Sequence, residues 1–159
     1  MDGNHWITVA HSGNSDITNI QIYDSLGQSP STETLHLIAR YVGCRSNHLT
    51  VSAMNVQSQM NSYDRGVFAL AFATAVAYGH DPTEQSYICN VMRGHVKSCV
   101  LSGCMLPFPS TTTCHKPKVC NTIQPTYCTC GYPDDGNVMI ECDKCSEWFH
   151  EQCIGPSCL

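Results

Sequence analysis

Paired cysteine and histidine residues near the C-terminus constrain the fold of this chain more than any other feature. Three pairs lie within 26 residues: Cys128-x-Cys130, Cys142-x-x-Cys145 and His150-x-x-Cys153. Such pairs place two ligands on one metal ion with little backbone strain. A disulfide framework is the alternative, but the first residues lack the basic and apolar regions of a secretion signal. The spacing therefore predicts a small module folded around zinc.

Composition and charge exclude several classes of function. Hydrophobic residues make up 42% of the 159 residues and charged residues 13%, which is typical of a folded chain. The net charge of −5 offers no basic surface for nucleic acid. No apolar segment has the length of a membrane span. We expect neither direct nucleic-acid binding nor membrane insertion.

The first two thirds of the chain predict an α+β fold. Strands are expected at residues 6–10, 18–23 and 49–56, and helices at 32–42, 65–78 and 84–103. The helix over 65–78 is apolar on every side, which predicts that it is buried. A polar segment over 110–126 is expected to be a linker.

Three short motifs in this part carry the residue types of a cysteine protease. His5 and Trp6 open the first strand, Asp24 follows the second, and Gln59 lies six residues before Arg65. Such an enzyme needs a base, a group that orients the base, an amide that stabilises the oxyanion, and a nucleophile at a helix start. Histidine, aspartate and glutamine can fill the first three roles.

The motifs HWITV, YDSL and Q-x-x-x-x-D-x-G-V-F resemble the ubiquitin-like-protein-specific cysteine proteases of the SUMO-protease type. The resemblance covers about residues 4–108 and implies a partial papain-like domain, with strands around a central buried helix. It implies that His5 is the general base, that Asp24 orients it, and that Gln59 donates to the oxyanion. Trp6 would cover the channel for a diglycine tail, and Arg65 stands at the position of the nucleophile.

Arginine at position 65 predicts that the chain is inactive as a peptidase, because a guanidinium stays protonated near neutral pH and cannot attack a carbonyl. A cation at a helix N-terminus also opposes the helix dipole, a cost that neighbouring Asp64 is expected to offset. None of the other cysteines of this part lies in a helix-start motif that could replace the nucleophile; these are Cys44, Cys89, Cys99 and Cys104. The family's domain has further sequence before its histidine motif, which this sequence does not include.

The C-terminal spacing, with WFH just ahead of the third pair, resembles a PHD finger over residues 127–154. The resemblance implies two zinc ions. The first would be held by Cys128, Cys130, His150 and Cys153. The second would be held by Cys142 and Cys145 with a final cysteine pair that this sequence lacks, since Cys158 has no companion.

PHD fingers commonly bind histone tails, some through an aromatic cage around trimethyl-lysine. Tyr127, Met139 and Trp148 match the cage positions, and Asp143 and Glu147 can attract a basic tail. Simple packing of the small core is the alternative role for Met139 and Trp148.

These observations predict a partial protease domain over residues 1–109, a linker over 110–126 and a finger over 127–159. The favoured hypothesis is a nuclear, catalytically inactive protease homologue that binds zinc, histone tails and a SUMO- or ubiquitin-like protein. Two alternatives stay open: an active peptidase for ubiquitin-like proteins, if a cysteine codon belongs at position 65, and a transposon-derived remnant without function.

Overall fold

The computed structural model describes residues 5–11, 18–43, 48–113 and 120–154. The chain divides into two compact units. The first draws on Met1–Ala10, Gln21–Ser29 and Ser52–Cys120, and the second on His11–Ile20, Pro30–Val51 and Asn121–Leu159. The turn expected over residues 12–17 lies outside the described residues.

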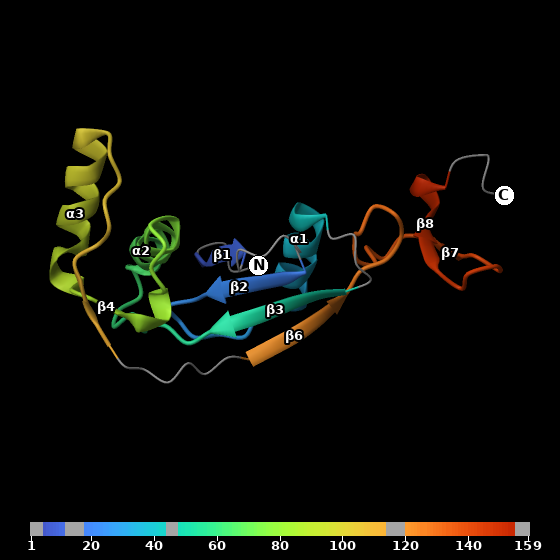
Figure 1. The fold of residues 1–159 in the computed structure, drawn as a ribbon, viewed down its shortest axis with the longest axis horizontal. Coiled ribbons are helices and arrows are strands. Elements are labelled where there is room, and N and C mark those ends of the chain that lie inside the picture. The colour runs from blue at the N-terminus through green and yellow to red at the C-terminus, as the bar shows by residue number, and fades with distance from the viewer. Residues whose placement is uncertain (1–4, 12–17, 44–47, 114–119, 155–159) are drawn as a thin grey trace. The chain divides into compact units, whose positions relative to one another are not determined.

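A four-stranded sheet has the order β1-β2-β3-β6, and β2, β3 and β6 run side by side in Figure 1. Its strands are β1 Thr8–His11, β2 Asn19–Tyr23, β3 His48–Met54 and β6 Cys120–Pro125. The first three confirm the strands expected from the sequence. Ile20 and Ile22 are buried on β2, as are Leu49 and Val51 on β3.

Helix α1, Thr32–Val42, follows its sequence signals closely. The Ser31 hydroxyl accepts the Thr34 N–H at 3.2 Å, which caps the N-terminus. Gly43 ends the helix in the left-handed conformation, with φ of 58°. The apolar stripe contributes Leu35, Ile38 and Ala39 to the core of the second unit.

Helix α2, Arg65–Ala77, packs against the aromatic core of the first unit. The core comprises Tyr23, Phe68, Ala71, Phe72, Tyr87, Met92 and Phe108. The expectation that this helix is buried on every side is wrong: Leu70 is 41% exposed. Phe68 and Phe72 face the core, whereas Leu70 lines an open groove.

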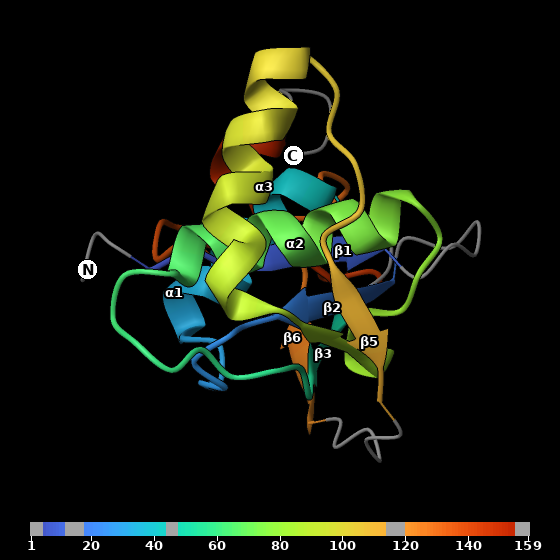
Figure 2. The ribbon, with the colours of Figure 1, turned by 90° about the vertical axis from the view of Figure 1, so that its left-hand side faces the viewer.

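The final helix of the first unit is shorter than expected. Helix α3 covers Cys89–Ser102 and packs across α2 (Figure 2). The residues before it form a short 3-10 helix, Pro82–Glu84, and strand β4, Gln85–Tyr87. Strand β4 pairs antiparallel with β5, Ser110–Thr112, so its backbone hydrogen bonds go to a neighbouring strand and not to a helix.

The polar segment over 110–126 is not structureless. It contains β5 and β6, because both find partner strands that its composition does not reveal. In the finger segment, β7 Met139–Glu141 pairs with β8 Trp148–His150, and a 3-10 turn, Glu151–Cys153, follows. No helix within the described ranges has both the length and the apolar character of a membrane span.

Candidate functional site: a substituted protease centre and a metal-ligand cluster

The structure brings His5 and Asp24 into contact. His5 precedes β1 and Asp24 follows β2, and these strands are neighbours in the sheet. His5 Nε2 lies 3.0 Å from Asp24 Oδ1. The same carboxylate accepts the backbone N–H groups of Leu26 at 2.7 Å and Gln28 at 3.1 Å. Asp24 is therefore fixed by its own turn and can orient the imidazole through Nε2, which leaves Nδ1 as the basic nitrogen.

Gln59 is connected to this pair by hydrogen bonds to Ser25, the residue after Asp24. The Ser25 hydroxyl donates to Gln59 Oε1 at 2.7 Å, and the Gln59 backbone N–H donates to the Ser25 carbonyl at 3.0 Å. The Gln59 amide N–H donates to the Asn61 carbonyl. One of its two amide hydrogens is thus used within the loop that leads to α2.

Arg65 is the first residue of α2, as its motif predicts for the nucleophile position. Its Nε donates to the Ser62 carbonyl at 2.9 Å. Trp6, which is 63% exposed, lies close to the start of this helix: a Cβ on Gly66 would stand 3.8 Å from the indole. Arg65 and Trp6 line one hollow of about 230 Å³ with Ser62, Tyr63 and Gly66.

Asp64 pairs with a residue that sequence reasoning missed. Arg93 on α3 approaches Asp64 Oδ1 through Nε at 2.8 Å and Nη2 at 2.7 Å, and Asn61 Nδ2 donates to Oδ2 at 2.6 Å. Arg93 also donates to the Tyr63 carbonyl at 2.9 Å and lies 5.1 Å from the centre of its ring. Asp64 is therefore held by both Arg93 and Asn61. A pairing across 29 positions leaves no local signal in the sequence.

These contacts lower the pKa of the Asp64 carboxyl. The hydrogen bond from Asn61 contributes most, burial opposes it, and the hydrogen bond and charge of Arg93 add to the lowering. The carboxylate stays ionised and holds the turn in front of α2.

The described cysteines of the first unit do not supply a replacement nucleophile with a base. Helix α3 begins at Cys89, whose sulfur accepts a contact from the Gln57 amide at 3.5 Å. Cys99 Sγ lies 3.4 Å from His95 Nε2, but that nitrogen also lies 2.9 Å from the Leu106 carbonyl. A carbonyl only accepts, so Nε2 carries a hydrogen and cannot take the thiol proton. Cys44 lies outside the described residues.

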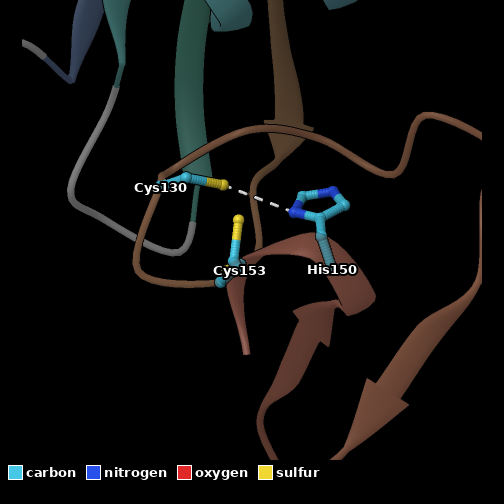
Figure 3. Close-up of side chains that lie close together, drawn as sticks. Cys130, His150 and Cys153 are labelled. Carbon is cyan, nitrogen blue, oxygen red and sulfur yellow. Dashed lines mark hydrogen bonds between the residues drawn. The ribbon is translucent and has the colours of Figure 1, made fainter. Parts of the chain in front are cut away.

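Four ligand atoms converge in the finger segment. They belong to Cys128, Cys130, His150 and Cys153 and all lie within 4.8 Å of one another. Figure 3 shows the Cys130, His150 and Cys153 side chains directed toward a common point. Cys130 Sγ is 3.3 Å from His150 Nδ1, while His150 Nε2 donates to the Pro133 carbonyl at 3.0 Å. This outer hydrogen bond fixes the tautomer that presents Nδ1 to a metal.

The donor types and the protonation of the four ligands are compatible with binding of a metal ion. Burial opposes ionisation of the Cys128 thiol, but hydrogen bonds, the largest from the Cys130 backbone N–H, lower its pKa to about 6. The hydrogen bond to Cys128, with burial, raises the pKa of Cys153 to about 11. Three thiols and one imidazole fit a four-coordinate metal, which takes the thiols as thiolates and releases their protons.

Cys142 and Cys145 are not part of this group of four. Backbone N–H groups of Cys145 and Lys144 lower the pKa of the Cys142 thiol, the arrangement of a C-x-x-C metal knuckle. Their assignment to a second ion stays a prediction, and Cys158 lies outside the described residues.

Of the three residues of the expected cage, Met139 and Trp148 lie on the β7–β8 hairpin and Tyr127 lies on the segment beside it. In the β7–β8 pairing Met139 is opposite His150, and Trp148 is two residues earlier on β8, so Met139 and Trp148 share a face as diagonal neighbours. Trp148 is 42% exposed. The N–H of Cys128 donates to the Trp148 carbonyl at 2.9 Å, which places Tyr127 beside β8.

The fold and these two centres define a class of protein: a cysteine-protease-type α+β scaffold followed by a small Cys/His metal-binding module. The chain belongs to the Ulp1 protease family, whose C-terminal catalytic domain matches residues 1–99, and its residues 128–158 match the PHD-finger family. The resemblance to both families is thus confirmed.

The similar proteins match this chain over short segments only. Set1 complex component spp1 of Schizosaccharomyces pombe is 52% identical over 31 residues, 20% of this chain and 7% of that protein. Transcription initiation factor TFIID subunit 3 of Xenopus laevis is 54% identical over 26 residues, 16% of this chain and 3% of that protein. Lysine-specific demethylase phf2 of Danio rerio is 53% identical over 32 residues, 20% of this chain and 3% of that protein.

This chain therefore spans less than a tenth of the length of any of these three relatives. No solved structure matches it significantly.

The Asp64 contacts predict a pH-dependent contribution to stability. Because the folded state lowers the Asp64 pKa, its stabilisation is complete above the carboxyl's ordinary pKa of 3.8 and is lost as pH falls through the folded value. We expect Asp64→Asn to lower the free energy of unfolding by about 1 kcal/mol at pH 7. The difference in unfolding free energy between wild type and Asp64→Asn should shrink below about pH 4. Urea unfolding across this range measures it.

The control is Asp143→Asn, which removes an exposed carboxylate from the finger. A wild-type advantage over Asp64→Asn that grows as pH falls would contradict the assignment.

The four-ligand cluster predicts a tetrahedral metal site. Cobalt(II) added to the reduced full chain should give intense thiolate and ligand-field absorption. Cys130→Ser should weaken cobalt binding by more than about a hundredfold, since loss of an outer partner alone costs 10- to 100-fold. Cys104→Ser, which removes an exposed thiol outside the cluster, should leave the spectrum unchanged. Equal spectra for the two variants would show that the cluster is not the site.

Proposed function

We propose that this chain is a catalytically inactive homologue of the ubiquitin-like-protein proteases that acts in the nucleus as a binding protein. Its PHD finger would hold zinc and bind a methylated histone tail, and its protease-like part would offer a surface for a SUMO- or ubiquitin-like protein. The observation that carries the proposal is Arg65, at the start of α2 beside Trp6, in a chain whose His5–Asp24 pair is formed.

The protease-like part supports binding without cleavage. The His5–Asp24 pair can orient a base, but a permanently charged guanidinium at the helix start gives that base no proton to remove. Without a nucleophile, such a site retains substrate contacts only. The roles of His5, Asp24 and Gln59 as inherited catalytic positions, with Trp6 over a tail channel, belong to this proposal.

Zinc is the metal that the cluster favours. Three thiolates with one imidazole in a four-coordinate arrangement are a typical structural zinc site. Cys128, Cys130, His150 and Cys153 supply this set. When bound, the metal would hold two segments of a small module together. Much of the folding free energy of the finger would therefore come from metal binding.

A histone tail is the partner that the finger's surface favours. Trp148 is half exposed and shares a hairpin face with Met139, so the pair can form one side of a cage for a quaternary ammonium group. Asp143 and Glu147 are exposed between the two strands and can attract a basic peptide. Names such as Set1 complex component and lysine-specific demethylase, carried by similar proteins, support a role at chromatin and a nuclear location.

Calorimetry tests the proposal on the zinc-loaded full chain. We expect a lysine-trimethylated histone-tail peptide to bind in the micromolar range and its unmodified counterpart more weakly. Trp148→Ala should weaken binding of the methylated peptide about tenfold, by loss of cation–π attraction and apolar contact.

Trp6→Ala is the matched control, because it removes the other of the chain's 2 tryptophans and lies outside the finger. Equal affinities for the methylated and unmodified peptides would refute methyl-lysine binding.

A further inference from the structure

The turn at the end of α3 brings two cysteines together. Gly103 follows the last residue of the helix in the left-handed conformation, with φ of 68°. The Cys104 N–H donates to the Cys99 carbonyl at 3.1 Å, and the Gly103 N–H donates to the Val100 carbonyl at 3.3 Å. These two bonds form a Schellman motif, in which the residue after the glycine commonly packs against the residue five positions before it. Here both of these residues are cysteines.

The backbone bond between the two cysteines limits how far apart they lie. A Cα atom is about 2.4 Å from its own carbonyl oxygen and about 1.5 Å from its own nitrogen. With an N···O distance of 3.1 Å, the Cα atoms of Cys99 and Cys104 are therefore less than about 7 Å apart. Disulfides join Cα atoms about 4.4–6.8 Å apart, so rotation of the side chains can bring the two sulfurs into bonding distance without refolding.

The two thiols differ in exposure. Cys104 is exposed and can meet a dissolved oxidant, whereas Cys99 is only 4% exposed. Cys99 Sγ lies 3.4 Å from His95 Nε2, inside the packing of α3. Cys104 is thus placed to react first, and Cys99 is placed to react with what forms on Cys104.

The segment that follows Cys104 turns back alongside α3 (Figures 1 and 2). The Met105 carbonyl accepts from the Tyr78 hydroxyl at 2.9 Å, and the Leu106 carbonyl accepts from His95 Nε2 at 2.9 Å. Phe108 is buried, and its ring centre lies 4.7 Å from that of His95. A covalent bond at Cys104 would add to these contacts and hold the start of the segment against the helix.

We propose that Cys99 and Cys104 are a redox-sensitive pair, which a peroxide oxidises to a disulfide that ties the end of α3 to the segment after it. This inference goes beyond the proposed function, since it involves neither the residue at position 65 nor the finger.

The reaction has two steps. The Cys104 thiolate attacks one peroxide oxygen, the O–O bond breaks, and Cys104 becomes a sulfenic acid while hydroxide leaves. The Cys99 sulfur then displaces the sulfenic hydroxyl, which takes the Cys99 thiol proton and leaves as water. Two thiols are oxidised to one disulfide, and one peroxide is reduced to two waters. A dithiol reverses the bond by exchange.

Peptide mass spectrometry tests the proposal on the reduced, zinc-loaded full chain after treatment with equimolar hydrogen peroxide and alkylation of the remaining thiols. One tryptic peptide, beginning at Ser98, contains Cys99, Cys104 and Cys114, so fragmentation must locate the bond. We expect at least about tenfold more of the Cys99–Cys104 disulfide than of any other, because neighbouring thiols have a high effective concentration. Dithiothreitol should restore both thiols.

Hydrogen exchange measures the consequence of the bond. Exchange at the Cys104 and Leu106 amides should slow at least about tenfold after oxidation, because local opening of the turn is restrained. Treated Cys104→Ser should show neither the disulfide nor the slower exchange. Two matched controls, Cys89→Ser at the other end of α3 and Cys114→Ser in the same tryptic peptide, should behave as wild type.

Three results would each overturn the inference. The first is recovery of Cys104 chiefly as a sulfinic or sulfonic acid with Cys99 still reduced. The second is a disulfide that joins Cys104 chiefly to Cys114 or to a second copy of the chain. The third is a Cys99–Cys104 bond that leaves the exchange of the Cys104 and Leu106 amides unchanged.

Discussion

The Arg93–Asp64 ion pair controls the geometry on which the protease-like part depends. It ties α3 to the turn before α2, and that turn determines which residue begins the helix and what lies beneath Trp6. In a protease this arrangement would hold a thiolate against a base. Here the first residue of the helix is Arg65, whose guanidinium stays protonated near neutral pH and cannot act as a nucleophile.

The finger depends on a different constraint, the convergence of four ligands from two segments about twenty residues apart in sequence. Cys128 and Cys130 lie on one segment; on the other, His150 ends β8 and Cys153 lies in the 3-10 turn that follows. Three thiolates at such distances repel one another unless a bound metal ion compensates their charge. The hydrogen bond from His150 to Pro133 shows that the outer shell is organised for the same purpose.

Elements that depend on contacts between residues close in sequence could be predicted from local sequence patterns. The periodicity of residues 32–42 predicted helix α1, and the Cys/His spacing predicted a metal-binding module. Pairing between distant segments has no such signal: the helix expected over 84–103 includes the residues of β4, whose partner β5 lies more than 20 residues later. Nothing local in the sequence indicates that Arg93 reaches Asp64. His5 and Asp24 meet because they flank neighbouring strands.

The most direct test of the central claim uses an electrophilic peptide ending in Gly-Gly, with adducts located by peptide mass spectrometry on the zinc-loaded chain. We expect no selective adduct on wild type and one at position 65 of Arg65→Cys, formed faster than with a scrambled probe. The rate should fall when His5→Ala is added, since His5 would act as the base. A selective adduct on any wild-type cysteine would contradict the claim that Arg65 has ended peptidase activity.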